Sequence, residues 1–377
     1  MKKRVLFYYP SNKRSVAIET LLEELVKQGI DVSFLSHIER GKIHETLDKL
    51  GVKTYSTPIK KGNALIYYAR QILFLIQFTR KHKIKFVFSN LQQANLIGVI
   101  AQYFMSAKVI CFRHHFKFFS KSQQKSAVVN KNEKFGDRLI NLLARKIVVP
   151  SSGVYNGMLN QENVRESKLS IIPYIYDFAQ YGKPDTDAVE EIKKATPAKL
   201  RLIMVSRLIP LKRHIIVLPL VKELLSENLN LHLYILDEGP EKERIESYIR
   251  EHGLTEAVTM LGFRTDFLDY MAASDLIIHP SITEASNSAV KEMALLSKSA
   301  IVCKKVGDFD DYILHRINGY LCDIDEFAKE AKEIIQELYN DPKHISQLGE
   351  NLNQTVLEKF SVNEETMDKY LNLLQES

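Results

Sequence analysis

Short apolar runs alternate with amphipathic segments along almost the whole chain, and this alternation limits the possible folds more than any other feature. In the first half, the runs that read as strands are residues 4–9, 32–36, 51–55, 86–89, 108–112 and 146–150. In the second half, they are residues 200–206, 231–236, 258–261, 276–279 and 300–303. Strands that alternate with helices are typical of parallel, doubly wound sheets, so the pattern predicts an α/β fold.

The chain is long enough for two domains. Its 377 residues allow each domain a hydrophobic core of its own, and 45% hydrophobic with 26% charged residues favours a soluble globular protein. We expect a first domain over residues 1–180 and a second over 199–359. The polar stretch 181–198, with two prolines, is interpreted as a linker, and 360–377 as a C-terminal helix.

Cysteine usage and hydropathy favour the cytoplasm. The three cysteines, Cys111, Cys303 and Cys322, form no close pair in the sequence and offer no disulfide or zinc pattern. The apolar run 5–9 is too short for a signal peptide. The longest apolar stretch, 64–78, contains polar residues and is shorter than the roughly 20 residues that a spanning helix needs. We therefore expect no membrane-spanning segment.

Positive charge is concentrated in one part of the first domain. Residues 51–150 contain 18 Lys or Arg and two acidic residues, a net charge of +16. Since the whole chain carries +6, the remaining residues carry −10. Such a basic block predicts a polyanionic partner: an anionic membrane surface, a lipid-diphosphate acceptor or nucleic acid.

Two segments of this block are candidates for that contact. Residues 64–85 read as a helix rich in Leu, Ile, Tyr and Phe that ends in a basic cluster. It is either a core helix whose last turn carries cations matched to the helix dipole, or a helix that lies on anionic lipid. Residues 113–125 interleave aromatic and basic residues, which also suits single-stranded nucleic acid. No other segment resembles a nucleic-acid module, so we expect no nucleic-acid partner.

Two glutamates follow the predicted strand 276–279. Glu284 lies between this strand and the next helix, and Glu292 lies about one and a half turns into that helix. The free N–H groups of a helix N-terminus bind phosphate, and carboxylates accept hydrogen bonds from sugar hydroxyls. A nucleotide sugar has both kinds of group, so this arrangement indicates a nucleotide-sugar site.

With these residues the sequence resembles the retaining glycosyltransferases of family 4, which have the GT-B fold and a Glu-x7-Glu motif at this place. Four further motifs follow the family's order. They are Val205-Ser-Arg-Leu-Ile-Pro-Leu-Lys212, Glu238-Gly-Pro240 with Val258-Thr-Met-Leu-Gly-Phe263, Asp275 with His279-Pro-Ser281, and Asn318-Gly-Tyr-Leu321. The resemblance implies two Rossmann-like domains that face each other across a cleft, and a C-terminal helix that returns to the first domain.

The resemblance also implies roles for single residues. Arg207 and Lys212 are expected to bind the donor diphosphate in place of a metal, which predicts a metal-independent enzyme without a cofactor. Glu284 is expected to contact the transferred sugar, and Glu292 the ribose hydroxyls. The backbone around Asn287 and Ser288 is expected to meet phosphate or sugar oxygens.

On the first domain, the resemblance places a histidine at the end of strand 108–112. The register favours His114 as the residue that reaches the donor sugar, with His115 as the alternative. A purely structural histidine at a strand end is the other interpretation.

Three positions depart from the family pattern. Residues 10–15 replace a Gly-Gly turn, so that side chains there are expected to narrow the cleft or contact a different acceptor. Arg213 stands where the family prefers glycine. Its side chain is expected either to contact phosphate or to be a solvated charge. Asn287 replaces another glycine, and asparagine tolerates the left-handed conformation as well.

The resemblance implies a retaining enzyme that moves a sugar from a UDP- or GDP-sugar to a glycan acceptor, expected to be lipid-linked, in bacterial surface polysaccharide synthesis. The basic block 51–150 adds the expectation that the protein binds the inner face of the cell membrane. Two alternatives remain open at this point. One is a nucleotide-sugar epimerase or hydrolase of the same fold, and the other is a non-catalytic scaffold that binds membranes or polyanions.

Overall fold

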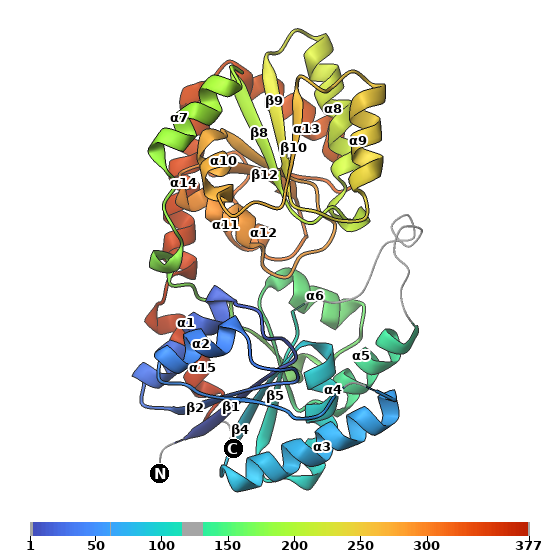
Figure 1. The fold of residues 1–377 in the computed structure, drawn as a ribbon, viewed down its shortest axis with the longest axis vertical. Helices are drawn as coiled ribbons and strands as arrows, with labels where there is room; N and C mark the ends of the chain where they lie inside the picture. Colours follow the sequence, from blue (N-terminus) through green and yellow to red (C-terminus); the bar gives the residue numbers. More distant parts are fainter. Residues whose placement is uncertain (1–2, 61, 115–130, 376–377) are drawn as a thin grey trace. The chain divides into compact units, whose positions relative to one another are not determined.

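A computed structural model describes residues 3–60, 62–114 and 131–375, which form two compact units (Figure 1). Unit 1 contains the described residues up to Gln180 together with the chain from Phe360 onward. Unit 2 runs from Tyr181 to Lys359. Each unit is built around one parallel sheet with helices on both faces, as the alternation of strands and helices predicts, and the GT-B fold is confirmed.

Unit 1 has a seven-stranded sheet in the order β3-β2-β1-β4-β5-β6-β7. Its strands are β1 (Arg4–Tyr9), β2 (Asp31–Ser36), β3 (Lys53–Ser56), β4 (Phe86–Asn90), β5 (Lys108–Phe112), β6 (Lys146–Val149) and β7 (Leu169–Ile171). Its helices are α1 (Val16–Lys27), α2 (Lys42–Lys49), α3 (Ala64–Lys81), α4 (Leu91–Ala101), α5 (Lys131–Leu143), α6 (Ser152–Asn160) and α15 (Glu364–Asn372), with the 3-10 turns η1 (Gln102–Phe104), η2 (Glu166–Lys168) and η3 (Phe178–Gln180).

Unit 2 has a six-stranded sheet in the order β10-β9-β8-β11-β12-β13. Its strands are β8 (Leu200–Val205), β9 (Leu231–Leu236), β10 (Val258–Gly262), β11 (Leu276–His279), β12 (Ser299–Cys303) and β13 (Tyr320–Cys322). Its helices are α7 (Thr186–Ala195), α8 (His214–Ser226), α9 (Lys242–Glu251), α10 (Phe267–Ala273), α11 (Ser288–Leu295), α12 (Phe309–Tyr312), α13 (Phe327–Tyr339) and α14 (Pro342–Phe360), with the 3-10 turn η4 (Pro210–Lys212).

Burial on both faces explains why the strands read as continuous apolar runs. All six residues of β9 and all four of β11 are buried, because helices cover both faces of a parallel sheet. The C-terminal helix α15 completes the core of unit 1. Met367 and Tyr370 of α15 pack in one cluster with Phe7 and Phe34 of the sheet.

The segment interpreted as a linker, 181–198, contains helix α7. The segment is polar, so its composition did not indicate a helix. A side-chain cap stabilises the start of the helix, and packing of one face stabilises the remainder. The side chain of Asp185 accepts hydrogen bonds from the backbone N–H groups of Asp187 and Ala188, and Val189 is buried. Strand β13, which has only three residues, was also not predicted.

Each sheet has one point where the strand order reverses, and such points are where open α/β sheets bind ligands. In unit 1 this point lies between β1 and β4, and in unit 2 between β8 and β11. The chain that leaves β8 and the chain that leaves β11 carry Arg207, Lys212 and Glu284. The topology therefore puts these residues at the crevice of unit 2.

Candidate active site

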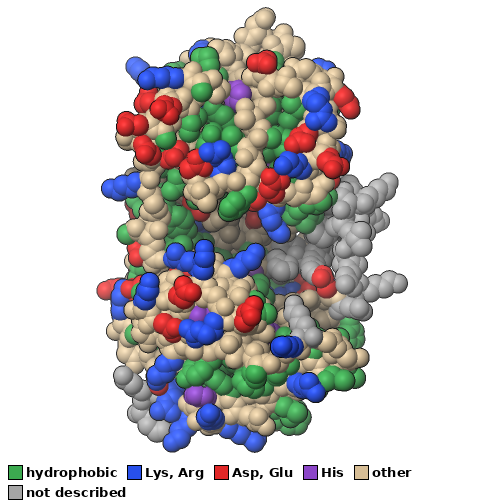
Figure 2. Space-filling model, in the orientation of Figure 1, with side chains coloured by type: hydrophobic (Ala, Val, Ile, Leu, Met, Phe, Trp, Pro, Cys, Tyr) green, Lys and Arg blue, Asp and Glu red, His purple; other side chains and the backbone are tan. Residues whose placement is uncertain are grey.

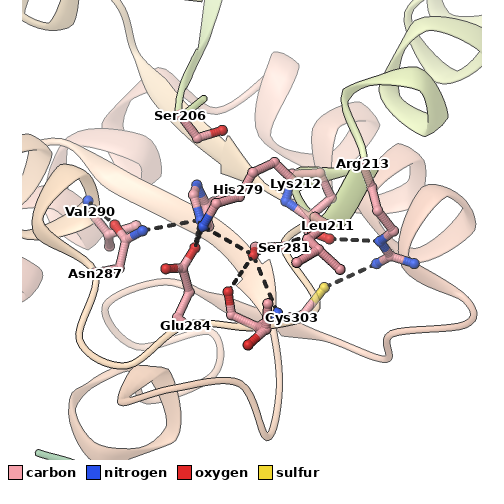
Figure 3. A network of polar contacts seen from close by, with 12 residues as sticks. Ser206, Leu211, Lys212, Arg213, His279, Ser281, Glu284, Asn287, Val290 and Cys303 are labelled. Carbon is pink, nitrogen blue, oxygen red and sulfur yellow. Dashed lines mark hydrogen bonds and ion pairs between the residues drawn. The ribbon is translucent and has the colours of Figure 1, made fainter. Parts of the chain in front are cut away.

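Glu284 is the centre of a polar network at the carboxyl ends of β8 and β11 (Figure 3). Its Oε1 accepts a hydrogen bond from the Nζ of Lys212, which lies at the end of η4. The same oxygen lies 2.6 Å from Nε2 of His279, the last residue of β11. The hydroxyl of Ser281 accepts from Lys212 at 3.4 Å and donates to the carbonyl of Thr283 at 2.9 Å. Three chain segments thus meet at one carboxylate.

This network keeps the carboxylate ionised although it is nearly buried. The side chains of Glu284 and Lys212 are 11% and 13% exposed. Burial alone would raise the pKa of Glu284, but the hydrogen bond and charge of His279 and the charge of Lys212 outweigh it and hold the pKa at about 2. No partner of Oε2 is found among the described residues, so this oxygen can accept hydrogen bonds from a ligand.

Glu292, on α11, has a raised pKa, whereas that of Glu284 is lowered. Burial raises the pKa of Glu292 to about 7, and the charge of Lys291 only partly opposes this effect. The described residues include no hydrogen-bond or ion-pair partner of its carboxylate. Burial raises the pKa of Tyr181, and the charge of Glu292 raises it further. A nearly buried acid without a partner is what a site for ligand hydroxyls requires.

Arg207 is exposed and lies outside the network of Glu284. None of the described residues forms a hydrogen bond or ion pair with its guanidinium. The loop that carries it is nevertheless fixed, because Leu208 exchanges backbone hydrogen bonds of 3.0 Å and 2.9 Å with Glu238 and Glu241. A Cβ at Gly239 would lie 2.3 Å from the carbonyl oxygen of Leu208, so only glycine allows this approach. The Glu238-Gly-Pro240 motif therefore supports the Arg207 loop.

Arg213 is neither a solvated charge nor available for a phosphate. Its Nε donates to the carbonyl of Pro280 at 2.8 Å and its Nη1 to that of Ile324 at 2.7 Å. Its Nη2 contacts the sulfur of Cys303 at 3.3 Å. The backbone of Arg213 has φ +53°, which explains why the family prefers glycine here. The side chain joins the loop after β8 to the ends of β11 and β12.

Asn287 forms hydrogen bonds inside unit 2 with both its side chain and its backbone N–H. Its Oδ1 accepts from the backbone N–H of Val290, which caps α11, and its backbone N–H donates to Asp308 at 3.3 Å. Its φ is −83°, so it does not use the left-handed conformation that glycine would allow. Ser288, the first residue of α11, is exposed. The helix terminus therefore offers Ser288 rather than Asn287 to a ligand.

The loop that carries Glu284 packs against the chain after β12. Gly307 has φ +58°, and a Cβ there would lie 2.7 Å from the Cβ of Glu284. Asp308 accepts from the hydroxyl of Ser286 at 2.6 Å and from Nζ of Lys291 at 2.6 Å. The sequence alone did not indicate Gly307, Asp308 or Lys291, because no motif joins Gly307 and Asp308 to residues so far away in the chain. It also gave no role to His279, although a polar residue at the end of a buried strand was a signal.

His114 lies at the carboxyl end of β5 in unit 1, as predicted from the register. Its Nδ1 is hydrogen-bonded to the hydroxyl of Tyr174, and its Nε2 lies 3.2 Å from Oδ1 of Asn90, the last residue of β4. The two contacts fix the orientation of the ring. His115 and the remainder of the aromatic and basic segment up to residue 125 lie outside the described residues.

The loop 10–15 of unit 1 is held by its own side chains. Arg14 forms an ion pair of 2.6 Å with Glu19 of α1, which is fully buried. Asn12 donates to the carbonyl of Glu39 at 3.1 Å. A Gly-Gly turn would have none of these contacts.

Comparisons with known proteins agree with this geometry. The family model of glycosyl transferases group 1 matches residues 186–355, and that of Glycosyltransferase Family 4 matches residues 15–180. The crystal structure of HepE from Anabaena in complex with UDP is similar to this chain, with a TM-score of 0.79, 20% identity and full coverage of both chains.

Two curated proteins are similar in sequence. The UDP-Gal:alpha-D-GlcNAc-diphosphoundecaprenol alpha-1,3-galactosyltransferase of Escherichia coli is 21% identical over 90% of this chain and 88% of its own. The N-acetyl-alpha-D-glucosaminyl L-malate synthase of Bacillus anthracis is 23% identical over 212 residues, and the match spans 55% of each protein. The two family models together span nearly the whole chain, which therefore belongs to the group 1 glycosyltransferases of family 4.

Proposed function

We propose that this protein is a retaining, metal-independent glycosyltransferase that moves a sugar from a nucleoside-diphosphate sugar to a lipid-linked glycan in bacterial surface polysaccharide synthesis. The observation that carries the proposal is the pair of unlike carboxylates at the crevice of unit 2. Glu284 is ionised and held by Lys212 and His279, whereas Glu292 is nearly buried and lacks a partner among the described residues. A sugar and a ribose supply the hydroxyls that such carboxylates bind.

The donor diphosphate is assigned to the cations and the helix terminus. Negative charge grows on the diphosphate as the glycosidic bond breaks, and fixed positive groups lower the barrier to this step. The exposed guanidinium of Arg207 can donate two parallel hydrogen bonds to phosphate oxygens, and Lys212 adds a point charge. The exposed start of α11 at Ser288 adds N–H groups. These groups supply the charge that a divalent metal supplies in other transferases.

Retention of the anomeric configuration follows from the family resemblance. The acceptor hydroxyl attacks from the face that the diphosphate leaves, and a phosphate oxygen of the leaving group takes the hydroxyl proton. No protein base is needed, so the role of the protein is to position both substrates. We assign His114 to the donor sugar, because its ring is held by Tyr174 and Asn90.

The relatives support the substrate classes. HepE is known in complexes with UDP and with UDP-glucose, which supports a UDP-sugar donor. The name of the Escherichia coli relative specifies a diphosphoundecaprenol-linked acceptor. An acceptor of this kind is embedded in a membrane, so the enzyme must work at a membrane surface.

Helix α3 provides a surface for this work. Its inner face packs in the core of unit 1 through Leu75 and Ile76, which confirms the core-helix interpretation for that face. Its outer face exposes Leu65 by 80%, Ile66 by 53% and Leu73 by 59%. Figure 2 shows hydrophobic side chains among Lys and Arg side chains over the part of unit 1 where Figure 1 places α3.

Basic residues share the outer face. Arg70, Arg80 and Lys81 are exposed on α3, and Arg80 donates to the carbonyl of Phe104, itself 61% exposed, at 3.0 Å. Apolar side chains flanked by cations suit an anionic bilayer. From this surface we propose peripheral binding at the inner face of the cell membrane. Among the described residues, no helix has the length and apolarity to cross a membrane.

The first prediction concerns the reaction. In EDTA, the protein is expected to transfer sugar from a UDP- or GDP-sugar to a diphospholipid-linked glycan, with retained anomeric configuration by NMR. Arg207→Ala should lower kcat by about 10²–10³-fold, because a preorganised charge at the leaving group is lost. Lys222→Ala, which removes an exposed cation on α8, is the matched control and should keep kcat.

Three other results of this assay would favour a different function or contradict the proposed roles. Release of nucleotide without any acceptor product would favour a hydrolase or an epimerase. Absence of turnover with every donor and acceptor would favour a non-catalytic scaffold. Activity only after a divalent metal is added would contradict the proposed role of Arg207 and Lys212.

The second prediction concerns the buried acid. The pKa of Glu292 is about 7 in the folded protein and near the ordinary 4.5 when unfolded, so the folded state binds the extra proton between these values. Ionisation of Glu292 therefore costs stability as the pH rises through 7. Glu292→Gln should raise the free energy of unfolding by about 2–3 kcal/mol at pH 8 and hardly at pH 4.5.

Urea unfolding at both pH values checks this prediction. Glu243→Gln, on the exposed side of α9, is the control and should change stability little at either pH. The same Glu292 variant should bind the donor more weakly, because the amide has one acceptor oxygen where the carboxylate has two. A stability gain that does not depend on pH would show that the pKa of Glu292 is the same in the folded and unfolded states, and would contradict the raised pKa.

The third prediction concerns the membrane. Wild-type protein should bind vesicles that contain anionic lipid in preference to neutral vesicles at low salt. The double variant Leu65→Ser/Leu73→Ser should bind them at least about tenfold more weakly, because two apolar side chains no longer enter the bilayer. Leu314→Ser/Ile317→Ser, at two exposed apolar positions of unit 2, is the control. Equal binding of the wild-type protein to neutral and anionic vesicles would contradict the proposal that it binds an anionic membrane surface.

A further inference from the structure

Three consecutive residues after β12 each contact a different part of the Glu284 network. Gly307 allows the approach of Glu284, since a Cβ there would lie 2.7 Å from that of Glu284. Asp308 binds the loop between Glu284 and α11. Phe309 packs edge-on against the ring of His279, with ring centres 5.8 Å apart. Residues 307–309 thus form a floor under the network.

Asp308 is the anchor of this floor. Its Oδ1 accepts from the backbone N–H of Asn287 at 3.3 Å, and its Oδ2 from the hydroxyl of Ser286 at 2.6 Å. Both hydrogen-bond donors lie in the three-residue stretch between Glu284 and Ser288, two residues assigned to the nucleotide sugar. A side chain that binds both of them fixes the path of the chain between those groups.

Lys291 makes this anchor possible. Both Asp308 and Lys291 are 1% exposed, and a buried carboxylate without a cation is very unfavourable. The Nζ of Lys291 lies 2.6 Å from Oδ2 of Asp308 and also donates to the carbonyl of Asn287 and the hydroxyl of Ser286, each at 3.0 Å. Lys291 thus binds the same residues, Ser286 and Asn287, that Asp308 binds.

We infer that Asp308, neutralised by Lys291, is a positioning residue that sets the place of Glu284 and His279 for the transfer step. This inference rests on the proposed function for its kinetic consequence but not for its geometry. A displacement of about 1 Å at reacting groups can cost 10²-fold in rate, so the effect should appear in kcat. Binding of free UDP should change less than kcat, because Arg207 and Glu292, two of the residues assigned to UDP, form no hydrogen bond with Asp308.

Two double variants separate the anchor from the ion pair. Lys291→Met/Asp308→Asn keeps a side-chain oxygen for the N–H of Asn287, whereas Lys291→Met/Asp308→Leu removes it. Neither variant leaves a single charge buried, so both are expected to fold. The Leu variant should lose at least about tenfold in kcat with UDP affinity within threefold of wild type, and the Asn variant should stay within about threefold of wild type in both.

A second readout does not depend on activity. In protein labelled with ¹⁵N at histidine, the Nε2 resonance of His279, assigned with His279→Gln, reports the contacts of this nitrogen with Glu284 and with Nδ2 of Asn287, 3.1 Å away. It should shift in the Leu variant and remain in the Asn variant. A wild type without transfer activity would overturn the proposed function alone. A Leu variant with wild-type kcat and an unchanged His279 resonance would overturn this inference.

Gly307→Ala tests the floor without a change in the ion pair. The added methyl group would meet Glu284, so kcat should fall at least about tenfold while the His279 resonance shifts. This variant keeps the inference testable if the Leu variant does not fold. Wild-type kcat in Gly307→Ala would also count against the inference.

Discussion

The carboxylate of Glu284 depends on two partners that come from different strands. Lys212 follows β8 and His279 ends β11, so the carboxylate is stabilised only when the two strand ends lie side by side at the point where the strand order of unit 2 reverses. Other contacts of the site hold these strand ends and loops in place. Arg213 joins the ends of β11 and β12, and Asp308 holds the loop after Glu284.

The two glutamates of the motif differ in pKa because their surroundings differ. Glu284 has its charge balanced before any ligand arrives, and its pKa of about 2 keeps it an acceptor at every physiological pH. Glu292 has no such balance, and its pKa of about 7 marks a stability cost that the bound ribose is proposed to offset. A site that is partly destabilised in the free enzyme is a common feature of binding sites.

The sequence was sufficient for the fold because the strands of parallel sheets are continuous apolar runs. The predicted bounds of β1, β5, β9 and β11 agree with the structure, and helical periodicity placed the helices between them. Helix α7 was missed because the polar and proline-containing composition of its segment favoured a linker, although Asp185 is a typical cap and Val189 and Ile192 have helical spacing. The helix packs against α10.

The site was predictable only where a residue follows a strand directly. The motifs placed Lys212 and Glu284 at one crevice, but they did not predict that the two form an ion pair, that Asn287 caps α11 or that Arg213 binds the carbonyl of Pro280. The contacts of Asp308 with Lys291 and of Gly307 with Glu284 join residues 17 or more positions apart. Such pairs are set by tertiary packing, which a single sequence does not record.

The central claim is that unit 2 binds a nucleotide sugar through Arg207 and Glu292 without a metal. The most direct test is the thermal stability of the purified protein in EDTA with a panel of UDP- and GDP-sugars, alongside Arg207→Ala and Glu292→Ala. A ligand at about 100 times its Kd contributes near 2.7 kcal/mol, so a cognate donor should raise the melting temperature of wild type clearly and that of either variant little. No stabilisation of the folded wild type by any nucleotide sugar would contradict the account.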